Sequence, residues 1–403
     1  MKRRQAEQGM TLIEMMVAVV ISMVLSVAVM AVMSTFEGRR RTLGSSSDLE
    51  QAGNLAMFQL DRWIRSAGTG LVRANSYAYG CKLFASKAGT QILPAPASSS
   101  TPPAPFASVN PGASGVFRLA PVMILPGQTT PGVSGHASDV LVLMSSGDDG
   151  SQVPTPFTAT PAAAQLTVAN TTEISPGDLL LIADQQFAAG NGPADCLVSQ
   201  AASTLATTGI GTAVALAGSY YAATVDTRSV VDFTDAAVTL DLGGDGTSNA
   251  TSLPPSFQLI GVGDNDTLYS YDLLQTAASP LQAQAEGVFE MHAVYGIDST
   301  GNPNNRIDQW VGAGSTSAYS VSALSAGTSG AAGLLKNIRA LRVALIMRTA
   351  LPEKDAVAAA TTLTMFSDLS ASGLTLTRTL SAAEQHYRYR VVETTIPVRN
   401  NNY

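Results

Sequence analysis

One carboxylate lies where a charge is costly. From Met10 to Phe36 the chain has 27 residues, and Glu14 is the only charged one among them. A charged side chain near the centre of a membrane helix costs about 2.5 to 3.5 kcal/mol on insertion scales, so an acid in such a segment marks a functional site unless it lies at the headgroup boundary. The carboxylate of Glu14 would be expected to pair with a cation, because a mispaired buried charge costs several kcal/mol.

Two turn-forming segments are rich in the oxygen ligands that calcium prefers. Residues 298–308 contain two Asp and three Asn side chains, and residues 241–246 read Asp-Leu-Gly-Gly-Asp-Gly. Neither segment has the Gly and the bidentate Glu at the offsets of an EF-hand loop. We therefore predict an Asx-rich turn at 298–308, with a calcium site as the alternative, and a hairpin loop at 241–246.

Residue patterns typical of catalysis are absent from the sequence. The three histidines, His136, His292 and His386, are scattered, and no H-x-x-x-H pair, G-x-S-x-G elbow or phosphate-binding glycine loop occurs. We expect no enzymatic activity, no cofactor and no metal.

The element that positions Glu14 is an apolar helix. At 1.5 Å per residue, residues 10–36 span about 40 Å, which exceeds the roughly 30 Å hydrocarbon core of a bilayer. A secretory signal peptide would have a shorter apolar core followed by a small-x-small cleavage site, and neither is found. Three basic residues flank the helix on each side (2–4 and 39–41), so charge does not fix its orientation.

A second helical pattern follows over residues 37–70. Apolar residues recur at three- and four-residue steps, which is typical of an amphipathic helix whose apolar face packs against another part of the protein. They are Leu49, Ala52, Ala56, Leu60, Trp63 or Ile64, and Ala67. Gly38 and the glycine and serine residues at 44–47 are expected to bend or fray the middle, and the Gly-Thr-Gly run at 68–70 to end the helix.

Residues 71–403 read as a β-rich head. Short apolar runs alternate with Gly, Pro, Asn and Asp, which predicts a mostly antiparallel sheet and, with the long helix, an α+β fold. Strands are predicted at 140–144, 179–182, 238–242, 257–262, 267–272, 291–297, 340–348 and 388–399. Alternation in 340–348 predicts one solvent-facing side, and Pro397 suits an edge position in the last strand.

A Pro-rich segment interrupts the head at residues 94–135. It contains nine prolines, and its first twelve residues are almost entirely Pro, Ala and Ser. We predict a flexible surface loop or insertion, with a partner-binding arm as the alternative.

Composition and charge limit the function classes. The chain is 45% hydrophobic and only 13% charged, which excludes wholesale disorder and is typical of exported β-rich proteins. Residues 81–330 carry 5 Lys and Arg against 19 Asp and Glu, a net charge of −14, while 1–80 and 331–403 carry +3 and +4. We expect no nucleic-acid partner, since most of the molecule would repel a phosphate backbone.

The residues around Glu14 resemble a known processing signal. The run Gly9-Met10-Thr11-Leu12-Ile13-Glu14, after a basic leader and before the apolar helix, resembles the class III signal of type IV pilins and type II secretion pseudopilins. The resemblance implies cleavage by a prepilin peptidase between Gly9 and Met10, methylation of the new terminal amine, and a role for Glu14 in subunit assembly. Met10 departs from the phenylalanine usual in that family. Residues 1–9 would then be a leader peptide.

Four later segments resemble PilW-type minor pilins. They are residues 58–68, 176–184, 286–298 and 389–400. The resemblance implies a long N-terminal helix packed on the head, and a single-pass inner-membrane prepilin with a periplasmic head. It also implies assembly into the extracellular type IV pilus, at or near the tip, with other minor and major pilins and a tip adhesin as partners. The alternatives are a minor pseudopilin of a type II secretion system, a tip adhesin or DNA-uptake receptor, and a single-pass membrane enzyme whose leader stays uncleaved.

The expected periplasmic location bears on the oxidation state of the two cysteines. Cys81 and Cys196 lack C-x-x-C spacing, and a head outside the cytoplasmic membrane would place them in an oxidising compartment. We predict a disulfide between them, with two separate buried thiols as the alternative. Closing a loop of roughly 100 residues would stabilise the fold by up to about 4.7 kcal/mol in the chain-entropy model.

Overall fold

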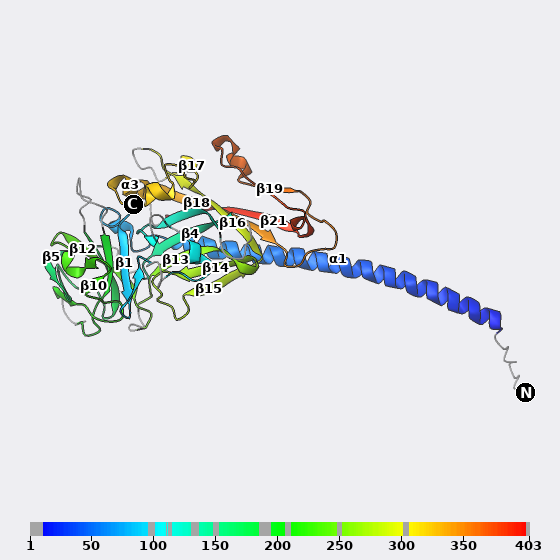
Figure 1. Cartoon of the computed structure of the whole chain (residues 1–403), viewed down its shortest axis with the longest axis horizontal. Helices are drawn as coiled ribbons and strands as arrows, with labels where there is room; N and C mark the ends of the chain where they lie inside the picture. Colours follow the sequence, from blue (N-terminus) through cyan, green and yellow to red (C-terminus); the bar gives the residue numbers. More distant parts are fainter. Residues whose placement is uncertain are drawn as a thin grey trace, which may run out of the picture. The chain divides into compact units, whose positions relative to one another are not determined.

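A computed structural model of the chain (Figure 1) describes most of the sequence. The described residues are 11–95, 101–109, 111, 115–129, 137–147, 153–184, 195–205, 211–247, 252–300 and 306–399. The leader and both residues of the predicted cleavage site, Gly9 and Met10, lie outside them. The chain divides into two compact units, Met1–Gln51 and Ala52–Tyr403.

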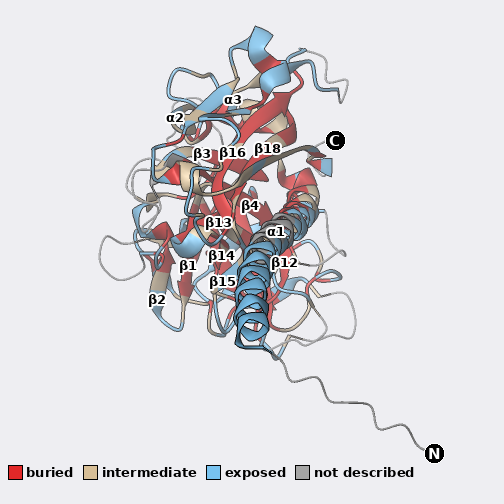
Figure 2. Ribbon diagram, turned by 90° about the vertical axis from the view of Figure 1, so that its right-hand side faces the viewer, coloured by how far each residue is buried: buried red, intermediate tan, exposed pale blue. Residues whose placement is uncertain are grey.

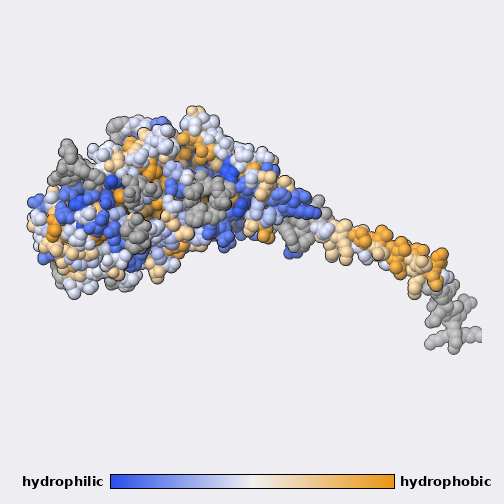
Figure 3. All heavy atoms as spheres, viewed as in Figure 1, coloured by the Kyte–Doolittle hydropathy of each residue, from blue (hydrophilic) through white to orange (hydrophobic). Residues whose placement is uncertain are grey.

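A single helix, α1 (Leu12–Ser66), runs through the N-terminal region. Its segment Leu12–Ser34 is apolar, unburied and long enough to cross a membrane, and Figure 3 shows the apolar surface of this segment in orange. The helix is continuous across Gly38 and 44–47, so these residues do not fray it. Each glycine costs only about 1 kcal/mol in a helix interior, and propagation from formed turns on either side outweighs that cost.

In the second unit, the last part of α1 packs tightly on the head. Ala56, Leu60 and Ile64 are fully buried, in agreement with the predicted apolar stripe. At Gly53 an added Cβ would lie 3.3 Å from Cγ of Met347, so the helix backbone comes very close to the sheet there. The helix ends before Gly68, which has a φ of 82°, as the Gly-Thr-Gly run predicts.

The described residues of the head form three larger sheets. The C-terminal sheet has the order β17 (Gln309–Val311), β16 (Val288–Ile297), β18 (Ile338–Arg348), β21 (Tyr389–Pro397). The middle sheet has the order β15 (Leu281–Glu286), β14 (Thr267–Asp272), β13 (Ser256–Gly263), β4 (Ala137–Ser145), β3 (Val122–Thr129). The 8-stranded sheet has the order β2 (Thr90–Leu93), β1 (Lys82–Lys87), β8 (Asp195–Gln200), β7 (Asp178–Asp184), β12 (Ala237–Gly244), β5 (Thr155–Ala162), β6 (Gln165–Val168), β9 (Ala213–Ala215).

Smaller elements complete the head. Two hairpins are β10 (Thr224–Val225) with β11 (Arg228–Ser229), and β19 (Thr362–Met365) with β20 (Leu376–Thr379). Short helices are α2 (Val321–Leu324) and α3 (Ser329–Lys336), with 3-10 turns η1 (Val72–Ala74), η2 (Phe106–Ser108), η4 (Val230–Asp232), η5 (Asp264–Asp266), η6 (Ser367–Ser372) and η7 (Glu384–His386). Figure 2 shows the buried residues, in red, concentrated in the strands. Among the described strands, only β1 and β8 pair in parallel.

The fold class is α+β, as predicted, and every predicted strand is present. Strand 267–272 has the predicted bounds, and the others differ by a few residues at their ends. The last strand, β21, pairs with β18 alone among the described strands, so Pro397 lies on an edge strand as predicted.

The predicted wet face of β18 is wrong, because both faces of the strand are covered. Only Arg342 and Arg348 are half-buried, and the other residues of the strand are buried. Ala344 and Ile346, on the same face as the two arginines, pack against side chains of β19 and η6. These two elements belong to residues 350–387, which leave the sheet after β18 and fold back over it.

The Pro-rich segment 94–135 is more ordered than predicted where the structure describes it. Strand β3 lies inside it and pairs with β4, and the side chains of Phe106, Phe117 and Leu119 are buried. Residues 96–100, 110, 112–114 and 130–135 of this segment lie outside the described residues. Most of the described prolines of this segment lie in connections outside the strands, where they do not interrupt sheet pairing.

A lobe of the head is an insertion into the middle sheet. β4 and β13 are hydrogen-bonded neighbours, with Ser145 opposite Ser256, yet the chain between them builds most of the 8-stranded sheet. This inserted lobe has its own apolar core, which includes Phe157, Leu180 and Ile182. The Sγ atoms of Cys81 and Cys196 form a disulfide with a Cα–Cα distance of 5.7 Å, at the start of the parallel pair β1 and β8.

Candidate functional site

Glu14, the acid in the apolar helix, has partners within its own first turn. The backbone N–H of Thr11 donates to Glu14 Oε2 at 3.0 Å, and the Thr11 hydroxyl donates to the same oxygen at 2.9 Å. The backbone N–H of Glu14 reaches the Thr11 hydroxyl at 3.4 Å. Thr11 is therefore the N-cap of α1, and Glu14 is the third helical residue of a capping box.

The capping box gives Glu14 a local role that the sequence analysis missed. A Thr followed three residues later by Glu, just before an apolar run, is the sequence signal for this motif, and it is present in Thr11-Leu12-Ile13-Glu14. The carboxylate satisfies a helix N-terminal donor that apolar surroundings would otherwise leave unpaired. A carboxylate also favours this end of a helix because of the helix dipole.

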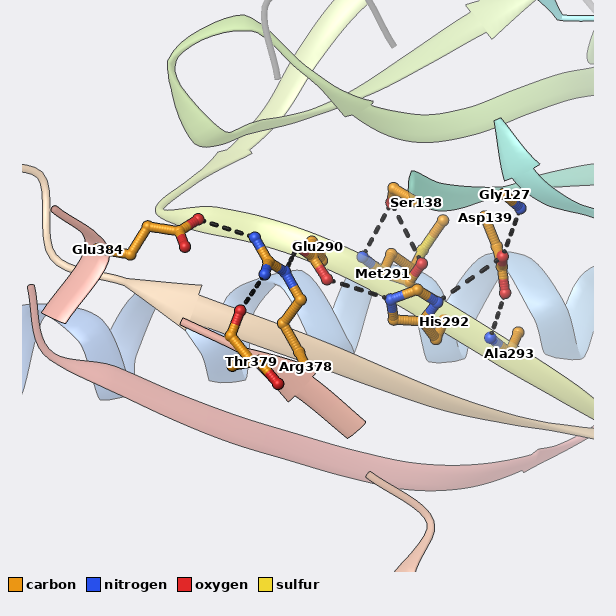
Figure 4. Close-up of polar contacts among 10 residues, drawn as sticks. All are labelled: Gly127, Ser138, Asp139, Glu290, Met291, His292, Ala293, Arg378, Thr379 and Glu384. Atoms are coloured by element: carbon orange, nitrogen blue, oxygen red, sulfur yellow. Dashed lines mark hydrogen bonds and ion pairs between the residues drawn. The ribbon is translucent and has the colours of Figure 1, made fainter. Parts of the chain in front are cut away.

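A second polar cluster joins two sheets of the head (Figure 4). The hydroxyl of Ser138 on β4 accepts the backbone N–H of Met291 on β16 at 3.0 Å and donates to its carbonyl at 3.2 Å. Next to it, Asp139 accepts the backbone N–H of Ala293 at 2.9 Å and that of Gly127 at 3.0 Å. Side chains of β4 thus replace the main-chain pairing that another strand would give β16.

His292 lies between two carboxylates in this cluster. Its Nε2 is 3.3 Å from Glu290 Oε2, and its Nδ1 is 3.8 Å from Asp139 Oδ1. Burial alone would lower the pKa of His292, but the hydrogen bonds and charges of Asp139 and Glu290 outweigh it and raise the pKa to about 9. The imidazole is therefore protonated at neutral pH and compensates the two buried acids.

Arg378 extends the cluster to the segment that covers the sheet. Its Nε is 2.7 Å from Glu290 Oε1, and its Nη2 is 2.8 Å from Glu384 Oε1. Burial would raise the pKa of Glu290, but His292 and Arg378 hold it below its usual value. Figure 4 shows these contacts running in one line from β4 across β16 to β20. The cluster compensates charge inside the head and ties three distant parts of the chain together.

The oxygen-rich segment 298–308 uses its first acid internally. Asp298 is buried, and its Oδ1 accepts from the hydroxyl and the backbone N–H of Thr300, as in an Asx turn. Its Oδ2 lies 3.6 Å from Nη2 of the buried Arg339. Residues 301–305 lie outside the described residues, and among those described no group of three or more acidic, His or Cys side chains is arranged to hold a metal ion.

The glycine-rich segment 241–246 lies at the end of β12. The predicted hairpin loop is wrong for residues 241–244, which belong to β12 and pair with β7, with a register shift between Asp241 and Gly243. Asp241 accepts the N–H of Gly243 at this shift, and Asp245 accepts from Thr247 and from the side-chain amide of Gln200 at 2.8 Å. Of the other histidines, His386 lies in η7 and His136 lies outside the described residues. The structure therefore does not bring the predicted candidates together; it unites His292 with acids that the sequence analysis did not select.

Two family models match the chain, one at each end. The prokaryotic N-terminal methylation motif matches residues 4–30, which contain Gly9, Met10 and Glu14. PilW, the type IV pilus-assembly protein W, matches residues 260–400. Over these two regions the chain is similar to PilW-like type IV pilins. No curated protein and no solved structure gives a significant match to it.

The PilW-like region coincides with definite parts of the fold. It contains the second half of β13 and all of β14 to β21, and so includes the whole C-terminal sheet with Glu290, His292, Arg378 and Glu384. Asp139 and the inserted lobe lie before it. The two matches support a pilin-like role and interaction with other pilus components, and the apolar helix with the methylation motif fits a membrane-anchored protein.

Proposed function

We propose that this PilW-like chain is a minor pilin of the type IV pilus. It is made as a prepilin, held in the inner membrane by α1 with its head in the periplasm, cleaved after Gly9 by the prepilin peptidase and methylated at Met10. It then joins the extracellular filament at or near the tip, where it initiates or caps the fibre and supports motility and adhesion. One observation carries the proposal: a methylation motif and a PilW match occur on one chain that also has a membrane-length helix.

Glu14 provides the assembly step in this proposal. In the bilayer the capping box with Thr11 satisfies the carboxylate. When the helix leaves lipid and packs among other pilin helices, a terminal ammonium on the same or a neighbouring subunit becomes the natural partner of the charge. The pair would set the axial register of the subunit, since a mispaired charge there is costly.

A binding role fits the head better than catalysis. The charged cluster of the head is engaged in internal contacts, and we propose no enzymatic activity and no nucleic-acid partner for the acidic middle of the chain. Other minor and major pilins, and a tip adhesin, are the proposed partners. A head of this size is more easily accommodated once, at the tip, than repeated along a thin fibre.

Substitutions at Glu14 separate capping from charge pairing. Glu14→Gln keeps the capping-box acceptor but removes the charge, whereas Glu14→Ala removes both. If the charge is needed for assembly, both variants should stay in the membrane and reduce the number of pili per cell at least tenfold. Thr11→Ala, which removes the N-cap hydroxyl and keeps the charge, is the matched control and should reduce pili much less. Wild-type piliation in Glu14→Gln would contradict the charge-pairing mechanism.

A minor pseudopilin of a type II secretion system is the nearest rival, because it shares the methylation motif. The match of residues 260–400 to a pilus-assembly family favours the pilus. Deletion of the gene should abolish or reduce pili and twitching without changing protein secretion. Loss of secretion with normal pili would assign the chain to the secretion system.

A further inference from the structure

The few basic residues in the acidic middle of the chain gather in one place. Residues 81–330 contain five Lys and Arg against 19 Asp and Glu. Three of the five, Lys82, Arg118 and Arg228, lie around the start of β1. Lys82 and Arg118 face one another in an isolated antiparallel bridge, and the hairpin of β10 and β11, which carries Arg228, packs beside β1 (Figure 1).

Lys82 and Arg118 are like charges in the closest kind of strand pair. Two backbone hydrogen bonds, each 3.0 Å long, join the neighbours of this pair rather than the pair itself. In such a pair the two side chains lie on one face and approach each other most closely. Like charges directly opposite one another are destabilising. An anion between the two side chains would replace this repulsion by attraction.

Two acids lie beside the basic residues, and each is paired. Nη2 of Arg228 forms a close ion pair with Oδ2 of Asp195. Nζ of Lys82 lies 3.9 Å from Oδ2 of Asp226. Three cations and two carboxylates leave this cluster with a net charge of +1.

Arg118 has donors that no acid of the described chain engages. Its Nη1 donates to the carbonyl of Gly80 at 2.8 Å, and no carboxylate in the described part of the chain forms an ion pair with it. The sequence itself has no Asp or Glu from residue 83 to residue 138. Burial lowers the pKa of Arg118, and the charge of Asp195 offsets this only in part.

The remaining donors of Arg118 can be reached from solvent. A guanidinium carries five N–H donors. The side chain is half-buried, and none of its nitrogens is among the fully buried polar atoms that lack a partner in the described chain. A ligand in solution could therefore bind these donors without an opening of the fold.

The basic side chains are held in place before any ligand arrives. Nζ of Lys82 lies 4.5 Å from the centre of the Phe84 ring, and Cζ of Arg228 lies 5.7 Å from the centre of the Phe233 ring. Both rings belong to the core of the inserted lobe. The disulfide joins the residues next to Lys82 and Asp195, which are opposite one another in β1 and β8. Such preorganisation lowers the entropic cost of binding.

Charge and geometry select the class of ligand. One negative charge balances the net charge of the cluster. A carboxylate carries that charge, and its two oxygens match the parallel N–H groups of a guanidinium. Residues 81–330 carry a net charge of −14, so a phosphate dianion or an acidic protein segment would be repelled more strongly than a single carboxylate.

We infer that Lys82, Arg118 and Arg228 form a binding site for a small molecule with one carboxylate group. The carboxylate lies between Lys82 and Arg118, while Arg228 keeps Asp195 in its own ion pair and so leaves Arg118 available. The site lies outside the regions that match the two family models and does not depend on the pilus role. Unchanged pili after deletion of the gene would overturn that role and leave this site standing.

Acetate is the simplest probe of the site. The full chain in detergent is titrated with ¹³C-acetate at constant ionic strength, and binding is measured from the transverse relaxation of the acetate signal. We expect Arg118→Gln and Lys82→Gln each to weaken binding roughly tenfold or more, because each removes a charged hydrogen-bond donor. Arg73→Gln, which changes an exposed arginine of η1, is the matched control and should bind as the wild type does.

The melting temperatures of the variants make the result decisive. If either substitution melts near the wild-type temperature and binds acetate as the wild type does, the inference is wrong. Lys82→Gln decides the matter if Arg118→Gln does not fold. Equal losses in Arg73→Gln would also overturn the inference, because acetate would then respond to the overall charge of the head.

Two further measurements test the class of ligand. Phosphate at pH 8 should displace acetate only at a higher concentration than acetate itself requires; displacement at a lower concentration would overturn the choice of a carboxylate. In cells treated with a water-soluble carbodiimide, which joins amines to carboxylates in contact, Lys82 should form an amide only with Asp226 of its own chain. An amide between Lys82 and another pilus subunit would overturn the assignment to a small molecule.

Discussion

His292 carries a charge inside the head because carboxylates of β4 and β16 face it. Its pKa of about 9 lies above the ordinary value of 6.5, so its contribution to stability is complete below pH 6.5 and is lost as the pH rises through 9. A protonated histidine between Asp139 and Glu290 also lets β4 and β16 lie side by side with two buried acids.

We predict that the free energy of unfolding falls by about 2 to 3 kcal/mol between pH 6.5 and 9.5, owing to His292. Chemical denaturation of the full chain in detergent, followed by near-UV circular dichroism, measures this fall. In Asp139→Asn the fall should be smaller and end at a lower pH, because one of the two charges that raise the folded-state pKa of His292 is gone. An unchanged pH dependence in His292→Gln would contradict the assignment.

The roles of single residues differ in how far they can be predicted from the sequence. The capping box of Thr11 and Glu14 is local, and its three-residue spacing can be read from the sequence alone. Ser138 and Met291 are 153 positions apart, and their pairing depends on which strand lies beside β16. No spacing rule predicts that contact, so the charged role of His292 could not be found from sequence.

At the scale of elements, local periodicity predicted the long helix and eight of the 21 described strands, and it failed where a distant segment covers a strand. The pattern of 340–348 shows polar arginines at two positions, which normally indicates solvent. In the structure the arginines are held by acids, Arg342 by Asp368 and Arg348 by Asp266, while β19 and η6 cover the apolar residues between them. The covering segment follows β18 in sequence, but its return over the sheet leaves no periodic signal.

The disulfide between Cys81 and Cys196 joins the start of β1 to β8 across 115 residues. Closing a loop of this length stabilises the fold by up to about 4.8 kcal/mol in the chain-entropy model. We predict that Cys81→Ala with Cys196→Ala lowers the free energy of unfolding by about 2 to 5 kcal/mol, measured by urea denaturation. Reductant should destabilise the wild type by a similar amount and leave the double variant unchanged. Equal stability with and without reductant in the wild type would contradict a structural role for the bond.

At the scale of the whole molecule, the two family matches lie at the ends of the chain and the inserted lobe lies between them. The residue pattern of 260–400 and of the N-terminus carries the resemblance to pilins, which is why both could be identified from sequence. The lobe leaves and re-enters the middle sheet at paired residues of β4 and β13, so these two strands pair although the lobe separates them in sequence. Two of its strands, β7 and β12, were predicted, whereas its other strands and its status as an insertion were not.

The state of the mature N-terminus tests the central claim most directly. The chain is purified from the membranes and pili of its own cells, and its intact mass and N-terminal residue are determined. We predict a polypeptide that starts at Met10 with a methylated amine and lacks residues 1–9. A protein that still carries its first nine residues in assembled pili, or that is absent from pili while remaining uncleaved in the membrane, would contradict the account.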